Sequence, residues 1–273
     1  RWLKNRTLIS STVGFGLMGV WALSLVGCGV FGTKLIGDYV AYTQSSPEYA
    51  QTIEERPVGA FDAISIKRAR VTVRSGEAFG VQVSGRKIDM ENIAIIDENG
   101  LLSISAVDHD GPCLFCNHSI PSVTVTVPSL QRVEIRGASL SLEKLTLPAL
   151  TIDAQGANLS GEASIASTTL NLQSSWNNLT LRSTSVAATV RNSRLELEGS
   201  ADTLLIDASN GSVSAEGMPV NTASVSAHNA NINVHAKQLD IQSDRNSTIE
   251  NDQVETQSAD PEAGASDTEK QEN

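Results

Sequence analysis

The sequence predicts an all-β fold, a parallel β-helix or solenoid with coils of about 18 residues. Two observations predict it. From residue 61 onward, short segments alternate apolar with polar or small residues and are separated by Gly, Asn or Pro, which is typical of short β-strands. From residue 132 onward, one pattern recurs in seven copies whose starts lie 16 to 20 residues apart. This period is too short for a propeller blade and lacks the helix of a leucine-rich repeat, so each copy is expected to form one coil.

The first 27 residues predict a signal peptide or a membrane anchor. A basic start, "RWLKNR", precedes a run without charge from Thr7 to Gly32, long enough for the ~20 residues that span a bilayer. The run ends in "LVGC", which resembles the lipobox of bacterial lipoproteins and implies cleavage before Cys28 and lipid attachment to its thiol. A retained transmembrane helix is the alternative. Both interpretations anchor the protein in the membrane of the cell envelope, facing the periplasm or the exterior, where conditions are oxidising.

Two segments flank the predicted folded part. Residues 28–60 are polar, contain two prolines and show no sustained period, so we expect a tether. Residues 250–273 are acidic, lack aromatics and have almost no aliphatic side chains, so we expect a disordered tail. The net charge of −11 argues against nucleic acid as a partner, because phosphate binding needs clustered Lys and Arg.

Residues 61–131 contribute the N-terminal strands, and residues 132–249 form the repeat coils. Each repeat has an apolar–x–apolar triplet, a polar turn and a second apolar position, and these apolar residues are expected inside. The triplet pairs are Val133/Ile135, Leu150/Ile152, Leu170/Leu172, Ala188/Val190, Leu204/Ile206, Ala223/Val225 and Leu239/Ile241, and the second positions are Leu140, Leu159, Leu179, Leu195, Val213, Ile232 and Ile249. Stacking of aliphatic on aliphatic accounts for the low aromatic content of 4%. Leu205, at a position that is polar in other copies, is expected on the surface.

Two polar columns accompany the repeats. A turn column, where Asn tolerates left-handed backbone, is expected at Ser139, Asn158, Asn178, Arg194, Ser212 and Asn231. The residue after each triplet forms a second column that begins with Arg136 and Asp153. Stacking in register would pair Arg136 with Asp153 and Arg191 with Asp207, as surface ion pairs worth at most ~1 kcal/mol each.

The repeats show no catalytic signature. There is no carboxylate cluster for sugar cleavage, no Ser–His–Asp pattern, no P-loop and no dinucleotide-binding motif. We therefore predict a binding or structural module, without catalysis and without a cofactor, whose partner is an envelope protein or a glycan. One alternative is a polysaccharide-active β-helix enzyme, and another is a metal-binding or redox accessory protein that acts through Cys113 and Cys116.

Several stretches resemble a known bacterial family. The opening "FDAISI", the strand "VTVTVPSL" and the "GAS"-like turns at residues 137–139 and 156–158 are similar to the family called putative auto-transporter adhesin, head GIN domain. The resemblance covers residues 61–248. It implies a right-handed β-helix that serves as an adhesin-like head in the cell envelope. Later repeats lose the Gly of the turn, as in "SSWNN" and "RNSRL", where the turn geometry is open.

The loop "DHDGPCLFCNHSI", residues 108–120, admits three interpretations. In an oxidising compartment Cys113 and Cys116 are expected to form a disulfide, which for so small a ring contributes only ~2 kcal/mol. A metal site made by Cys113, Cys116, His109 and His118 has the correct ligand count. Redox chemistry through the two cysteines is the third, but nothing indicates the helix N-terminus that would lower a thiol pKa.

Two aromatic side chains are candidates for contact with a ligand. Phe115 lies between the two cysteines, and Trp176 lies at a predicted turn in "SSWNN". Each can also pack against its own coil, which for Trp176 is the more common outcome because large aromatics gain most by burial.

Overall fold

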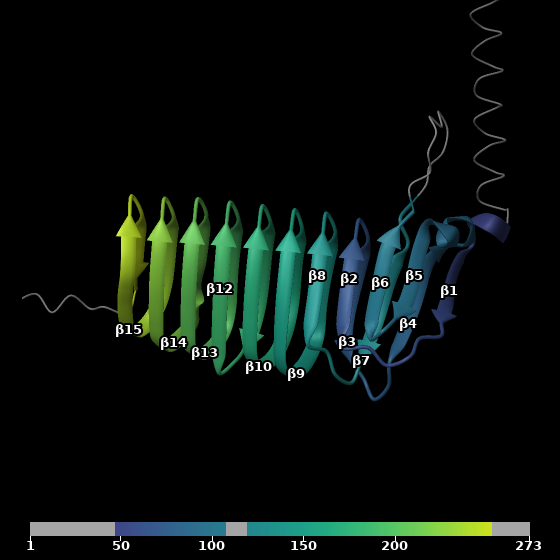
Figure 1. Cartoon of the computed structure of the whole chain (residues 1–273), viewed down its shortest axis with the longest axis horizontal. Helices are drawn as coiled ribbons and strands as arrows, with labels where there is room; N and C mark the ends of the chain where they lie inside the picture. Colours follow the sequence, from purple (N-terminus) through teal and green to yellow (C-terminus); the bar gives the residue numbers. More distant parts are fainter. Residues whose placement is uncertain (1–46, 108–118, 253–273) are drawn as a thin grey trace, which may run out of the picture. The chain divides into compact units, whose positions relative to one another are not determined.

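The computed structural model describes residues 47–107 and 119–252, and the chain divides into two compact units. One unit comprises Arg1–Thr52 with Arg86–Ile88. Its described part holds a 3₁₀ helix, Pro47–Tyr49, and the Arg86 guanidinium lies 5.6 Å from the centre of the Tyr49 ring. The other unit comprises Ile53–Gly85 with Asp89–Asn273 and contains the predicted all-β solenoid (Figure 1).

Sixteen strands form over the described residues. The strands of the first part of the chain are β1 (Gln51–Arg56), β2 (Ala63–Lys67), β3 (Arg70–Ser75), β4 (Gly80–Arg86), β5 (Ile93–Glu98), β6 (Leu101–Ala106), β7 (Ser122–Val127) and β8 (Arg132–Arg136). Those of the coils are β9 (Ser139–Gln155), β10 (Asn158–Gln173), β11 (Trp176–Arg182), β12 (Ser185–Arg191), β13 (Arg194–Ser209), β14 (Ser212–His228), β15 (Asn231–Arg245) and β16 (Thr248–Asn251). A second 3₁₀ helix, Lys87–Asn92, precedes β5.

Each coil has two arms, because a long strand bends once and continues. The first arm of β9, residues 139–143, pairs in parallel with β3, and its second arm, residues 151–155, pairs in parallel with β8. In the coil that follows β10, the two arms are separate strands: β11 forms the first arm and β12 forms the second. All pairs from β8 to β16 are parallel, and Figure 1 shows these strands side by side along the solenoid.

The inside of the solenoid is aliphatic, as predicted. The triplet residues of the first six copies are at most 3% exposed, and the second apolar positions from Leu140 to Ile232 at most 2%. Leu205 is 50% exposed, which confirms the expected surface position. The prediction is wrong for Ile241, which is 49% exposed, because among the described strands nothing pairs with the far edge of the second arm of β15.

The columns differ from the expected alignment by two residues in several copies. Ile152 lies in register with Val133, Leu170 and, further along, Ile206, whereas Leu150 faces Thr168. In the other arm, the position expected for Leu179 belongs to Asn177, which lies between Leu159 and Leu195. A shift of two residues leaves every side chain on the same face of a strand, so the inside was predicted correctly and the columns were not.

The turn between coils has one residue with positive φ, two positions before each coil's first strand residue. These residues, with φ between 48° and 57°, are Gly137, Gly156, Ser174, Asn192, Asn210, Asn229 and Asn246. The expected turn column was therefore placed two residues too late, and its Asn178 belongs further along β11. The later coils keep the turn without Gly because Asn, and here one Ser, also adopt this conformation.

Candidate functional site

The outer face of the second arms carries two adjacent polar columns. One column contains Glu134, Asp153, Asn171, Thr189 and Asp207 in successive coils. The second column, two residues further along each strand, contains Arg136, Gln155, Gln173, Arg191 and Ser209. Successive members lie about 4.8 Å apart, the spacing of paired strands. The result is a flat array of hydrogen-bonding groups on a rigid sheet.

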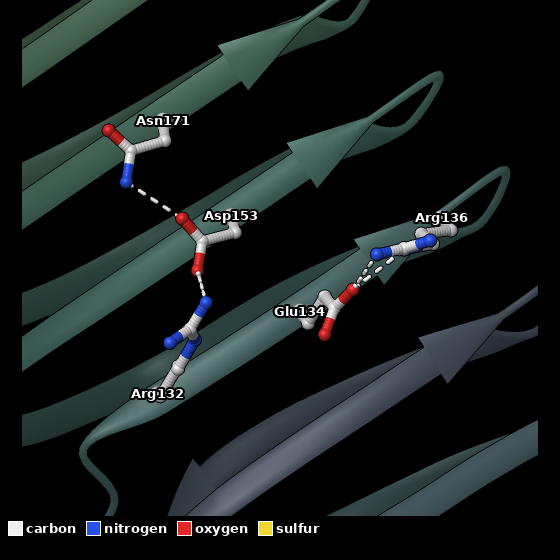
Figure 2. A network of polar contacts seen from close by, with 5 residues as sticks. All are labelled: Arg132, Glu134, Arg136, Asp153 and Asn171. Carbon is white, nitrogen blue, oxygen red and sulfur yellow. Dashed lines mark hydrogen bonds and ion pairs between the residues drawn. The ribbon is translucent and has the colours of Figure 1, made fainter.

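A polar network joins the first coils of this face (Figure 2). The Asp153 carboxylate forms an ion pair with Arg132, Nη2 to Oδ2 at 2.8 Å, and accepts a hydrogen bond from Asn171 Nδ2 at 2.7 Å. The Glu134 carboxylate pairs with Arg136 of its own strand, Nη2 to Oε1 at 2.5 Å. Each carboxylate thus has its own arginine.

The two ion pairs predicted between neighbouring coils are wrong. Arg136 lies in register with Gln155, and Asp153 lies in register with Glu134. Arg191 lies beside Ser209, while Asp207 lies beside Thr189. The cause is the same shift of two residues that affects the interior columns.

A shallow, open hollow of about 390 Å³ lies over these columns. Its polar lining includes Arg136, Asp153, Gln155, Asn171, Gln173 and Arg191. Arg132 and Arg136 are engaged by carboxylates, but within the described chain Arg191 forms no ion pair. The hollow therefore offers amide groups along its length and one uncompensated guanidinium at the end nearer the C-terminus.

The chemistry of the hollow favours binding. Over residues 47–107 and 119–252, no three His, Cys, Asp or Glu side chains come close enough to hold a metal ion. Within the hollow, the carboxylates of Glu134 and Asp153 lie in register on adjacent strands. A glycosidase would use two such carboxyls as acid and as base or nucleophile, but here each carboxylate is bound to an arginine.

Trp176 lies outside the hollow, just beyond the next turn. It is the first residue of β11 and lies in register between Asn158 and Arg194. Its side chain is 69% exposed, so it does not pack into its coil. The Arg194 Cζ atom lies 5.9 Å from the centre of the ring, which makes a cation–π contact with one face of the indole.

Asn177, the next residue, was missed by the sequence analysis. It points inward and is 5% exposed, within a column that holds Leu159 and Leu195. Its Nδ2 donates to Ser175 Oγ at 3.0 Å and to the Arg194 carbonyl oxygen at 3.0 Å. The available signal was the strand parity of β11: Leu179 and Leu181 are buried, so Asn177 must be inside and Trp176 outside.

Comparison with known proteins identifies the family. The family model "Putative auto-transporter adhesin, head GIN domain" matches residues 60–251. The chain belongs to this family. The adhesin head family is one of cell-surface or envelope proteins by its description, and it is not described as a family of enzymes.

Solved structures support the fold of this adhesin head domain. A "putative lipid binding protein" from Parabacteroides distasonis is 11% identical, with a TM-score of 0.51, and the match covers 74% of this chain and 93% of that one. A "putative adhesin" from the same organism is 12% identical, with a TM-score of 0.50, and covers 74% and 97%. At this identity the likeness concerns the fold alone. No curated protein matches the chain.

The other predicted site residues lie outside the described residues. They are Cys28, His109, Cys113, Phe115, Cys116 and His118. Within the described segments, no helix is long and apolar enough to cross a membrane.

Proposed function

We propose that this adhesin head domain is a non-catalytic binding module, held at the envelope membrane through Cys28, that binds a hydroxyl-rich glycan in the hollow of the second arms. The observation that carries the proposal is the pair of polar columns along the hollow. Gln155 and Gln173 offer both donors and acceptors, and Arg191 adds a fork of donors.

The geometry of the columns suits a polymer. Side chains of one column repeat at about 4.8 Å along the solenoid, and the backbone that carries them is fixed by parallel pairing on both sides. An extended glycan advances by a comparable length per sugar ring. Several rings can therefore meet polar groups in successive coils, so that contacts that are weak one by one add up along the chain.

A glycan fits better than a lipid or an enzyme substrate. The hollow is open and polar, and the interior of the described coils is filled by aliphatic side chains such as Ile152 and Leu172, which leaves no room there for an acyl chain. Glu134 and Asp153 are each held by an arginine, so both carboxylates of the hollow are engaged in ion pairs.

The test is a calorimetric titration of the full chain in detergent micelles with three soluble hexasaccharides, of β-1,4-linked N-acetylglucosamine, β-1,4-linked glucose and α-linked mannose. We expect one of them to bind and the double variant Gln173→Ala, Arg191→Ala to bind about tenfold more weakly, the loss of roughly two hydrogen bonds. Gln238→Ala is the matched control, an exposed Gln on β15 away from the hollow, and should bind as wild type. Unchanged affinity in the double variant would reject the hollow as the site.

The anchor is tested separately. Radiolabelled palmitate should label the wild type in a bacterial host and be absent from Cys28→Ser, because the lipobox-like "LVGC" offers that thiol for acylation. Equal labelling of both proteins would favour the retained transmembrane helix.

We also propose that Cys113 and Cys116 form a disulfide, which can be tested on the same protein preparation. Thiol alkylation before and after reduction, read by intact mass, decides between this disulfide and two free thiols.

A further inference from the structure

Trp176 stands out because it is the only aromatic residue between positions 132 and 252, and it lies on the outside. Its register neighbours in the same outer column are small or polar, namely Ser139, Asn158, Arg194, Ser212 and Asn231. A tryptophan stabilises a fold chiefly by burial of its large apolar surface. With 69% of its surface exposed, Trp176 contributes little of this kind to the solenoid.

The indole is held in a defined orientation. Arg194, on the following coil, places its guanidinium carbon 5.9 Å from the ring centre, and such a cation–π contact favours one orientation of the ring. Arg194 covers one face of the ring, so the opposite face is the one left for a ligand, and the other neighbouring coil is the preceding one, that of β10. The register neighbour there is Asn158, whose side chain is short and exposed.

The backbone that carries Arg194 is tied to the coil of Trp176 from inside. Asn177 Nδ2 donates to the Arg194 carbonyl oxygen and to Ser175 Oγ, both at 3.0 Å. Ser175 continues the network to Ser193, Oγ to Oγ at 3.3 Å. To make these bonds the chain places an amide where Leu159 and Leu195 stand in adjacent coils, and it leaves the Asn177 Oδ1 atom buried without a partner.

Trp176 and Asn177 are thus two consecutive departures from the repeat. One exposes a side chain that would stabilise the core, and the other buries a side chain that destabilises it. Residues that depart from a repeat and lower the stability of the fold without improving its packing are expected at functional sites.

From this geometry we propose that Trp176, Arg194 and Asn158 form a subsite for one pyranose ring of a glycan. The free face of the indole stacks on the C–H face of the sugar, and the Arg194 guanidinium and the Asn158 amide donate hydrogen bonds to its hydroxyl groups. The surroundings favour a sugar over an apolar protein surface, since Asn178 donates to Glu196 at 3.5 Å beside the ring and no wider apolar patch is formed by the described neighbours.

The inference rests on the proposed function for its ligand class but concerns another surface, because none of the three residues lines the hollow. Gln173 and Trp176 lie on either side of the turn formed by Ser174 and Ser175. The two sites can therefore fail independently.

Trp176 can report on its own ligand. The chain has three tryptophans, so Trp2→Phe with Trp21→Phe leaves Trp176 as the sole indole emitter in the full chain. The variant, in detergent micelles, is titrated with the same three hexasaccharides. We expect a saturable blue shift with the hexasaccharide that binds, because stacking removes the ring from water.

Affinity by calorimetry then separates the outcomes. Trp176→Ala should bind the hexasaccharide about tenfold more weakly than the wild type, and Trp176→Phe less than threefold more weakly. Arg194→Ala should bind it several-fold more weakly. Each loss corresponds to one or two ordinary non-covalent contacts. Arg182→Ala, an exposed arginine at the other end of β11, should bind as wild type. Binding that depends on Gln173 and Arg191 but leaves Trp176 emission unchanged overturns this inference alone. If none of the three sugars binds, both proposals are overturned.

Discussion

Two neighbouring coils follow the same backbone path with different contents. The coil of β10 and the coil of β11 and β12 pair residue for residue, from Asn158 with Trp176 to Gln173 with Arg191. In the first, an asparagine is outside and Leu159 is inside. In the second, a tryptophan is outside and Asn177 is inside. The comparison shows that a coil is specified by the alternation of buried and exposed side chains along its strands and by its turn. Single positions can therefore hold a residue that serves a purpose other than folding.

The turn residue before each strand explains how the second coil tolerates its amide. Ser175 supplies a hydroxyl that accepts a hydrogen bond from Asn177, whereas the equivalent residue in the first coil is Ala157. Both turn residues are almost fully buried, so water cannot replace the missing partner.

Leu159→Asn should have the largest effect, because it places an interior amide like that of Asn177 in the first coil, where no hydroxyl equivalent to that of Ser175 is present. Ala157 has no hydroxyl, so the new amide lies buried and poorly bonded, and the unfolding free energy should fall by about 4 kcal/mol. Urea unfolding followed by circular dichroism measures it. A loss below about 1 kcal/mol would show that any coil accepts an interior amide, and the comparison would lose its basis.

Gly161→Ala should have the next largest effect and lower the unfolding free energy by about 3 kcal/mol. Gly161 has φ +123°, and a Cβ atom there would lie 2.1 Å from the Leu142 carbonyl oxygen. Gly156→Asn is the matched control, because φ is +57° with open space around it and Asn occupies the equivalent position in Asn192 and Asn210. The unfolding free energy of Gly156→Asn should lie within about 0.5 kcal/mol of that of the wild type. Similar losses for the two variants in urea unfolding would contradict the assignment of Gly156 to the turn column.

Arg132→Ala should have the smallest effect, a fall in unfolding free energy of about 0.5 kcal/mol, since the Arg132 side chain is 61% exposed and water screens its pair with the half-buried Asp153. The difference from wild type should shrink in high salt, measured as the shift in unfolding midpoint. A loss above 2 kcal/mol that resists salt would mean that the network of Figure 2 stabilises the fold, and would weaken its role as a ligand surface.

The sequence was sufficient for the fold and for the two faces of each strand, but not for the register. Alternation has a period of two, so a column can slip by two residues with no change in which side chains are buried. Coil starts that vary in spacing hide such slips. This is why Leu179 was placed in the column of Asn177, and why Arg136 was paired with Asp153. The backbone pairing that decides these positions depends on bends and bulges, such as the shift between Glu162 and Ala163, that carry no clear signature.

The candidate site was predictable in part. Trp176 was recognised as a candidate contact, and the parity of Leu179 and Leu181 would also have placed it in solvent. The hollow could not be predicted, because it depends on which polar residues of separate coils stand side by side. Glu134 and Asp153 are 19 residues apart in sequence, and only the register brings them together.

The central claim is that the coil of Trp176 gives up stability for a binding surface, and Asn177→Leu tests it most directly. The variant restores the aliphatic column and removes an unpartnered buried oxygen, so the unfolding free energy should rise by about 1 kcal/mol. The affinity for the hexasaccharide that binds should fall several-fold, because the Arg194 backbone loses its tether. A variant that is less stable than wild type and binds the sugar equally well would contradict the account.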